Sequence, residues 1–235
     1  NQNRKMPDLK LFEFGNVYKL SEYYDNNKSV TDNYIQHEML ALFLTGKKQA
    51  ENWYIPSTKI DFFYLKAFLN NIFKRIGINI NSFETDNAVS EIFAEGLSLC
   101  KSGDKIVEYG EVNANIIKNA GIKDTVFYAA INWNKIVELS AFDNYIIKDL
   151  PKFPEVKRDL ALVIDKNVKY SDIEINVYKT AKPLLKNISL FDVYEGDKIE
   201  SDKKSYAIRL ILEDKEKTLT DEIINATIEK IIFSL

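Results

Sequence analysis

In the last third of the chain, segments with strand-like and helix-like hydrophobic periodicity follow one another in an order that few folds share. Residues 157–165, 188–195 and 205–213 read as strands, because their side chains alternate between apolar and polar faces. Residues 171–181 and 221–235 read as helices, since their apolar residues recur at spacings of three and four. The predicted order is therefore strand, helix, strand, strand, helix.

Polar residues at the expected helix ends support this order. Ser171 and Glu174 have the spacing of a capping box, and Thr220 is placed to cap the last helix. The apolar stripe of that last helix is expected at Ile224, Ile228, Ile231, Ile232 and Leu235. The order matches a ferredoxin-like unit that lacks its final strand, in which both helices cover one face of the sheet.

Strand alternation assigns side chains to the helix-free face of this sheet. Residues expected on the helix side are Leu160, Leu162, Ile164, Phe191, Val193, Tyr206, Ile208, Leu210 and Leu212. Residues expected on the open face are Asp159, Ala161, Val163, Leu190, Asp192, Tyr194, Ser205, Ala207, Arg209 and Ile211. An aromatic ring with short polar groups suits unpaired nucleic-acid bases. From the alternation alone, the favoured interpretation is a plain solvated strand, with Tyr194 as a good strand former and Asp192 as a solubilising charge.

The first part of the chain reads as an antiparallel sheet with helices packed on it. Residues 9–18 and 34–45 are predicted strands that pair across a polar loop. Residues 61–76 form the clearest predicted helix, with Asp61 as its cap and Gly77 at its end. Further strands are expected at 97–101, 106–112 and 126–133, and short helices at 115–119 and 134–142. The predicted fold class is therefore α+β.

A proline-rich segment marks the expected domain boundary. Leu150-Pro151-Lys152-Phe153-Pro154 holds two of the five prolines, and each proline disfavours helix at the residue before it. We expect one domain over residues 1–145 and a second over residues 146–235. Because the chain opens at Asn1 without an initiator Met, we expect it to be a piece of a longer cytoplasmic protein.

Composition excludes several kinds of function. The 46% hydrophobic and 29% charged residues are typical of a soluble globular protein. The net charge of −3 by itself does not indicate a nucleic-acid binder. One Cys and one His exclude a disulfide framework and a zinc site built from those ligands. The apolar runs fall short of the roughly 18 residues that a membrane span needs. We therefore expect no metal site and no membrane contact.

Five sequence segments of the second domain, taken together, resemble those of a known family. They are Phe153-Pro154, Arg158-Asp159-Leu160-Ala161, Leu190-Phe191-Asp192-Val193-Tyr194-Glu195-Gly196, Lys204-Ser205 and Thr218-Leu219-Thr220-Asp221-Glu222. In this order they resemble the ferredoxin-fold anticodon-binding domain that ends the bacterial phenylalanyl-tRNA synthetase β chain. The first part resembles the catalytic-like module that precedes it, through residues 11–18, 42–46, 61–66 and, more faintly, 110–112.

The resemblance implies an α2β2 enzyme that charges tRNA(Phe) with phenylalanine, using ATP and magnesium. It places the chemistry in the α subunit, while the catalytic-like module packs against α and the last domain holds the anticodon. Carried onto this sequence, the anticodon contacts fall on Ala161, Asp192, Tyr194 and Ser205. We also expect phosphate or base contacts from Arg158, Lys204 and Arg209. Exposed aromatics around the helix at 61–76 are the expected patch for the α subunit.

The arginine distribution argues against catalysis by this chain. Class II synthetase sites hold ATP with two arginines, whose planar fork binds phosphate oxygens at two points. No arginine lies between Arg4 and Arg75, or between Arg75 and Arg158. We therefore expect no catalytic residue and no bound cofactor here. A ferredoxin-like module that binds an amino acid remains an alternative, although residues 168–171 contain no glycine-rich ligand loop.

Overall fold

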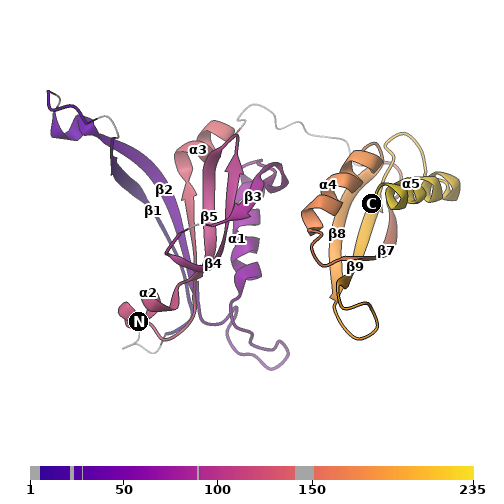
Figure 1. The fold of residues 1–235 in the computed structure, drawn as a ribbon, viewed down its shortest axis with the longest axis horizontal. Helices are drawn as coiled ribbons and strands as arrows, with labels where there is room; N and C mark the ends of the chain where they lie inside the picture. The colour runs from indigo at the N-terminus through magenta and orange to yellow at the C-terminus, as the bar shows by residue number, and fades with distance from the viewer. Residues whose placement is uncertain (1–5, 22–23, 28, 89, 141–150) are drawn as a thin grey trace. The chain divides into compact units, whose positions relative to one another are not determined.

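The computed structural model describes residues 6–21, 24–27, 29–88, 90–140 and 151–235 (Figure 1). The chain divides into two compact units, Asn1–Tyr145 and Ile146–Leu235, which are described separately as the N-terminal and C-terminal units. The boundary predicted at 145/146 and the start of the proline segment at Leu150 lie outside the described residues, as does the predicted helix end at 141–142.

The N-terminal unit is built on a six-stranded antiparallel sheet in the order β1-β2-β6-β5-β4-β3. Its strands are β1 Leu9–Leu20, β2 Tyr34–Thr45, β3 Glu84–Asn87, β4 Phe93–Lys101, β5 Asp104–Val112 and β6 Val126–Asn132. The predicted pairing of the first two strands is confirmed, with Leu9 opposite Thr45 and Leu20 opposite Tyr34. Strand β3 was not predicted, because its four residues are all exposed and show no apolar alternation.

Helix α1, Phe62–Arg75, covers this sheet against β5 and β6 (Figure 1). As predicted, Asp61 caps the helix: its carboxylate accepts a hydrogen bond of 2.8 Å from the Tyr64 amide. Leu65, Leu69 and Phe73 recur every four residues and are fully buried against the sheet. The unit also contains α2 Ala114–Asn119, α3 Trp133–Leu139 and 3-10 turns at Val30–Asn33 and Ile80–Ser82.

The C-terminal unit follows the predicted order of strands and helices. Its elements are β7 Val156–Asp165, α4 Tyr170–Ala181, β8 Leu185–Tyr194, β9 Lys203–Leu212 and α5 Asp221–Ser234. The three strands form an antiparallel sheet in the order β7-β9-β8, and residues 151–235 contain no fourth strand. The observed class is therefore α+β with antiparallel sheets.

Both helices of the C-terminal unit pack on one face of its sheet (Figure 1). Val177 of α4 and Ile231 of α5 are buried in one cluster with Ile208 and Leu210 of the central strand β9. Because both helices use this face, the opposite face of the sheet carries no helix. That open face is where the sequence places its candidate binding residues.

Three details of the helices differ from the sequence predictions. Helix α4 begins one residue earlier than expected, with Lys169 in the N-cap position, so Ser171 lies inside the helix and the predicted capping box does not form. Thr220 does occupy the N-cap of α5, but its side chain makes no capping hydrogen bond. Ile232 and Leu235 are exposed rather than buried, because Ile232 is turned about 100° from the buried Ile231 and Leu235 follows the last helical turn.

Candidate nucleic-acid interface

Strands β7 and β9 present their two faces as the alternation predicts. Every second residue of β9, from Lys204 to Leu212, is buried, and Leu160, Leu162 and Ile164 of β7 pack on the helix-side core. The intervening residues of β7, including Asp159 and Ala161, are exposed. These two strands therefore define an open face, and the polar side chains on it do not pack in the hydrophobic core.

Strand β8 departs from the prediction because it contains a bulge at Phe191. Leu190 lies opposite Ile208, whereas Asp192 lies opposite Ala207, so Phe191 has no partner on β9. The extra residue shifts the alternation of the strand by one position. Leu190 consequently packs on the helix-side core and Phe191 does not, so the prediction for both residues was wrong.

Beyond the bulge, the register places the predicted site residues on the open face. Ala161 and Asp192 flank Ala207 on its two neighbouring strands, which makes one row across the sheet. Tyr194 lies opposite Ser205 in the next row. The structure therefore brings Ala161, Asp192, Tyr194 and Ser205 together on one surface.

Tyr194 presents its ring at this surface, where the side chain is 39% exposed. The ring lies over the backbone of Gly196, two residues further along the chain. Among the described residues, the Asp192 carboxylate has no ion-pair partner. An accessible ring and a carboxylate that is not neutralised are therefore neighbours on the open face.

Arg209 lies on the other side of the Ala207 row from Tyr194 and is held by two partners. Its Nε and Nη2 donate hydrogen bonds of 2.7 Å each to the two carboxylate oxygens of Asp159. Its guanidinium also lies over the ring of Phe191, 4.9 Å from the ring centroid. The hydrogen bonds from Arg209 lower the pKa of Asp159, and those same bonds raise the pKa of Arg209. The arginine is thus fixed in place with its charge compensated.

The other two predicted basic contacts do not reach the open face. Lys204 is only 8% exposed, and its ammonium donates a hydrogen bond of 2.8 Å to the Lys166 carbonyl. Arg158 lies opposite Leu210 and donates to Asp221 at 3.3 Å, at the start of α5. Strand alternation could have predicted this, because Arg158 is two residues from Leu160 and therefore lies on the helix side. Lys204 is likewise two residues from Tyr206.

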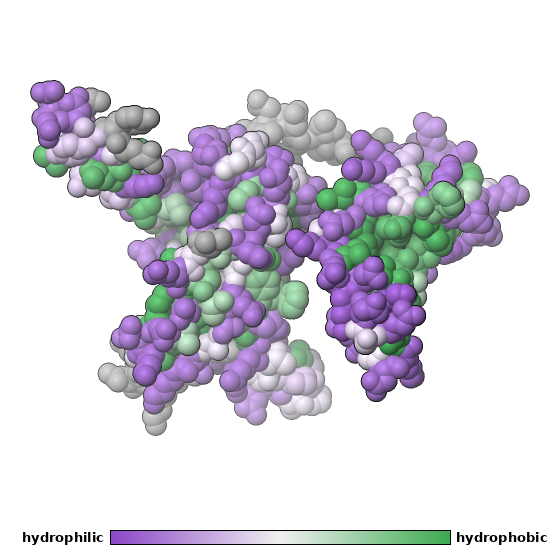
Figure 2. All heavy atoms as spheres, in the orientation of Figure 1, coloured by the Kyte–Doolittle hydropathy of each residue, from purple (hydrophilic) through white to green (hydrophobic). Residues whose placement is uncertain are grey.

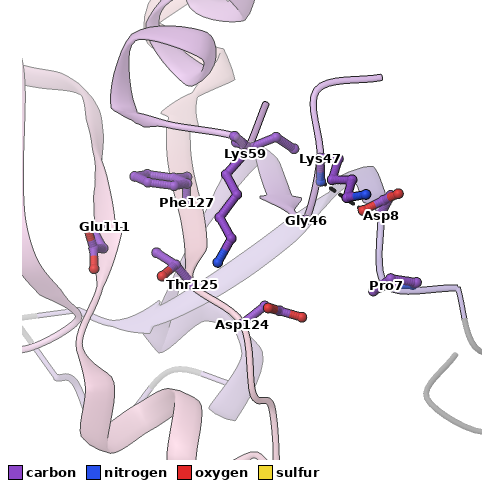
Figure 3. A pocket seen from close by; sticks show the side chains of 10 residues that line it. Pro7, Asp8, Gly46, Lys47, Lys59, Glu111, Asp124, Thr125 and Phe127 are labelled. Atoms are coloured by element: carbon purple, nitrogen blue, oxygen red, sulfur yellow. Dashed lines mark hydrogen bonds between the residues drawn. The ribbon is translucent and has the colours of Figure 1, made fainter. Parts of the chain in front are cut away.

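In the N-terminal unit, a cavity of about 240 Å³ lies where β2 ends (Figure 3). Gly46 has a φ of +84° there, and the Asp8 carboxylate accepts a hydrogen bond of 2.8 Å from the Lys47 amide. Lys59 extends toward Thr125 and Asp124. The described residues that line it supply two lysines and three carboxylates.

Apolar side chains are exposed along the β1–β2 ribbon of the same unit (Figure 2). Phe12 and Phe14 line a groove of about 460 Å³ together with Leu42, Phe68 and Trp133. The rings of Phe14 and Trp133 meet edge to face at 5.4 Å. Exposed apolar surface of this extent is typical of protein interfaces.

In the described part of the chain, no helix is long and apolar enough to cross a membrane. The same residues contain no group of three or more His, Cys, Asp or Glu side chains that could hold a metal ion.

Comparison with known families gives two matches that together cover most of the chain. Residues 151–235 match the model for the ferredoxin-fold anticodon binding domain, and residues 1–133 match that for the phenylalanyl tRNA synthetase beta chain CLM domain. The first match covers the unit for which amino-acid binding was an alternative, so that alternative is not favoured.

Curated relatives agree with both matches. A phenylalanine–tRNA ligase beta subunit of Bacteroides thetaiotaomicron is 40% identical over 236 aligned residues, and one of Porphyromonas gingivalis is 34% identical over 232. The alignments cover 100% and 98% of this chain but only 29% and 28% of those relatives. A solved pyrrolysyl tRNA synthetase from Desulfitobacterium hafniense overlaps 59% of this chain and 44% of its own at 14% identity, and its TM-score of 0.40 is too low to support a fold assignment.

Proposed function

The chain belongs to the phenylalanine–tRNA ligase β-subunit family, and on that premise we propose that its C-terminal unit binds the anticodon of tRNA(Phe). The N-terminal unit is, in this proposal, a class II synthetase-like module that packs against the α subunit of an α2β2 enzyme in the cytoplasm. The whole enzyme uses ATP and magnesium to join phenylalanine to its tRNA, and this chain contributes binding surfaces rather than the reaction.

The observation that carries the proposal is the arrangement of Ala161, Asp192, Tyr194 and Ser205 in adjacent rows of one helix-free sheet face. The exposed Tyr194 ring offers a flat apolar surface on which an unpaired base stacks. The Asp192 carboxylate accepts hydrogen bonds from base N–H groups, and the Ser205 hydroxyl both donates and accepts. Ala161 is small, so it leaves room for a base edge to approach the sheet.

The lining of the N-terminal cavity supports the proposed assignment of catalysis to the α subunit. Lys47 and Lys59 attract an anion, but a lysine ammonium is a point charge without the bidentate geometry of arginine. The carboxylates of Asp8, Glu111 and Asp124 line the same cavity and would repel a triphosphate. We assign ATP and magnesium to the α subunit for this reason.

Exposed apolar side chains support the proposed contact with the α subunit. Phe12 and Phe14 of β1 and Phe63 of α1 are all at least half-exposed. Large apolar surfaces of this kind are typical of permanent subunit interfaces. The expected patch therefore includes β1 as well as the aromatics of α1 that the sequence singled out.

The test is a titration of the chain with a fluorescently labelled anticodon stem-loop of tRNA(Phe) at low salt, followed by anisotropy. Tyr194→Ala should weaken binding about 5- to 150-fold, because stacking contributes about 1–3 kcal/mol per base. Tyr54→Ala is the matched control, since Tyr54 is an exposed tyrosine of the other unit. Absence of binding, or undiminished binding by Tyr194→Ala, would contradict the proposal.

A further inference from the structure

We propose that Phe191 is a second base-stacking platform on the open face, held flat by the Arg209–Asp159 pair. This inference rests on the proposed RNA-binding function and adds a contact that the resemblance did not assign. Its ligand is an unpaired nucleobase that neighbours the base stacked on Tyr194.

Because of the bulge in β8, Phe191 is not part of the hydrophobic core. The side chain is 52% exposed, and the buried helix-side cluster is complete without it. A bulge sets two residues against one partner residue and bends the strand locally. Phe191 and Asp192 lie against Ala207, whose side chain is on the open face. Because Phe191 is absent from the helix-side cluster, we place its ring on the open face as well.

The contact with Arg209 confirms this direction and prepares the ring for stacking. Arg209 lies on the open face, and its guanidinium is 4.9 Å from the centroid of the Phe191 ring. Two hydrogen bonds of 2.7 Å to Asp159 fix the guanidinium, so the ring meets a rigid neighbour. Guanidinium planes and aromatic rings are the two side-chain surfaces on which RNA bases stack.

The charges select a base rather than a phosphate as the ligand. Because Asp159 compensates Arg209, the pair offers little net attraction to a phosphate group. The Asp192 carboxylate, adjacent to Phe191, would repel phosphate and accept hydrogen bonds from a base edge. Phe191 and Tyr194 are three residues apart on one strand, and with the bulge between Leu190 and Asp192 their span is about 7–10 Å, so each ring can take its own base.

The experiment uses the full 235-residue chain and an anticodon stem-loop that carries 2-aminopurine in the loop. Phe191→Ala should weaken binding about 5- to 150-fold and reduce the quenching of 2-aminopurine, whereas Phe191→Trp should preserve both. Phe233→Ala is the matched control, because Phe233 is 96% exposed on α5 and its removal should leave the affinity unchanged. Phe191→Leu keeps an apolar side chain but no flat ring, so it should bind as weakly as Phe191→Ala.

The outcomes separate this inference from the proposed function. If Tyr194→Ala weakens binding while Phe191→Ala or Phe191→Leu binds like the parent chain, the second platform is wrong and the proposed function stands. If the parent chain does not bind the stem-loop at all, the proposed function fails and this inference fails with it. Thermal unfolding of each variant shows whether the fold is kept, and the Leu and Trp variants decide the question if the Ala variant does not fold.

Discussion

The ring of Tyr194 and the backbone of Gly196 approach each other so closely that a larger residue at position 196 requires the ring to move. A Cβ atom built on Gly196 would lie 2.7 Å from the Tyr194 Oη and 2.9 Å from its Cζ. Distances this short are well inside van der Waals contact. The missing side chain of Gly196 therefore leaves room for the tyrosine ring in this position.

Gly196→Ala should consequently weaken RNA binding several-fold while changing thermal stability little. The added methyl group pushes the half-buried ring from its place, and the ring can move because part of it faces solvent. Anisotropy titration and thermal unfolding measure the two effects. Gly15→Ala is the control, since nothing lies within 4 Å of a Cβ built there; equal affinities for the two variants would contradict the prediction.

The pKa of Asp159 should depend on Arg209. Hydrogen bonds from the guanidinium lower this pKa from its ordinary value of 3.8, so the pair is intact above pH 3.8 and is lost as the pH falls through the lowered pKa. Arg209→Gln should return the pKa upward toward 3.8. Carboxyl-carbon NMR titration checks this, with Arg158→Gln as the control because Arg158 pairs with Asp221 instead.

Leu69→Ala should destabilise the N-terminal unit by about 2–5 kcal/mol, because it removes a fully buried side chain and leaves a cavity. Phe63→Ala on the same helix should change the free energy of unfolding by less than about 0.5 kcal/mol, since Phe63 is 75% exposed. Urea unfolding of both variants gives the comparison. A similar loss from both would mean that Phe63 is packed in solution.

Alkaline pH should destabilise the N-terminal unit through Tyr109. Burial raises the pKa of Tyr109 from 10.0 to about 12, so the unfolded chain ionises this group first. Stability is fully present below pH 10 and falls by up to about 3 kcal/mol as the pH rises toward 12. Tyr109→Phe should flatten this part of the pH profile in urea unfolding. Tyr54→Phe, at an exposed position, should leave the profile as it is.

Regular periodicity made much of the fold predictable from the sequence. Strand β2 begins and ends where its apolar pattern does, Asp61 caps α1 as its position indicates, and the alternation of β9 holds along its whole length. The short strand β3 was not predicted, because it is exposed and has no hydrophobic alternation. Its place in the sheet comes from pairing with β4, which is a tertiary contact.

The candidate site was predicted less completely, and β8 shows why. Alternation carried from Asp192 to Tyr194 gave the correct face, but carrying it backward to Leu190 failed at the bulge. A bulge depends on the register of the partner strand, and nothing in Leu190-Phe191-Asp192 marks it. Arg158 and Lys204 were different, because their phase with Leu160 and Tyr206 already placed them on the helix side.

The bulge at Phe191 divides β8 into two stretches whose side chains serve different purposes. Ile188 and Leu190, before the slip in phase, anchor the sheet to its helices, while Asp192 and Tyr194, after it, face outward. Substitutions at Asp192 or Tyr194 can therefore change which ligand the open face binds without disturbing the hydrophobic core. Ligand preference in this unit can evolve, or be engineered, independently of its stability.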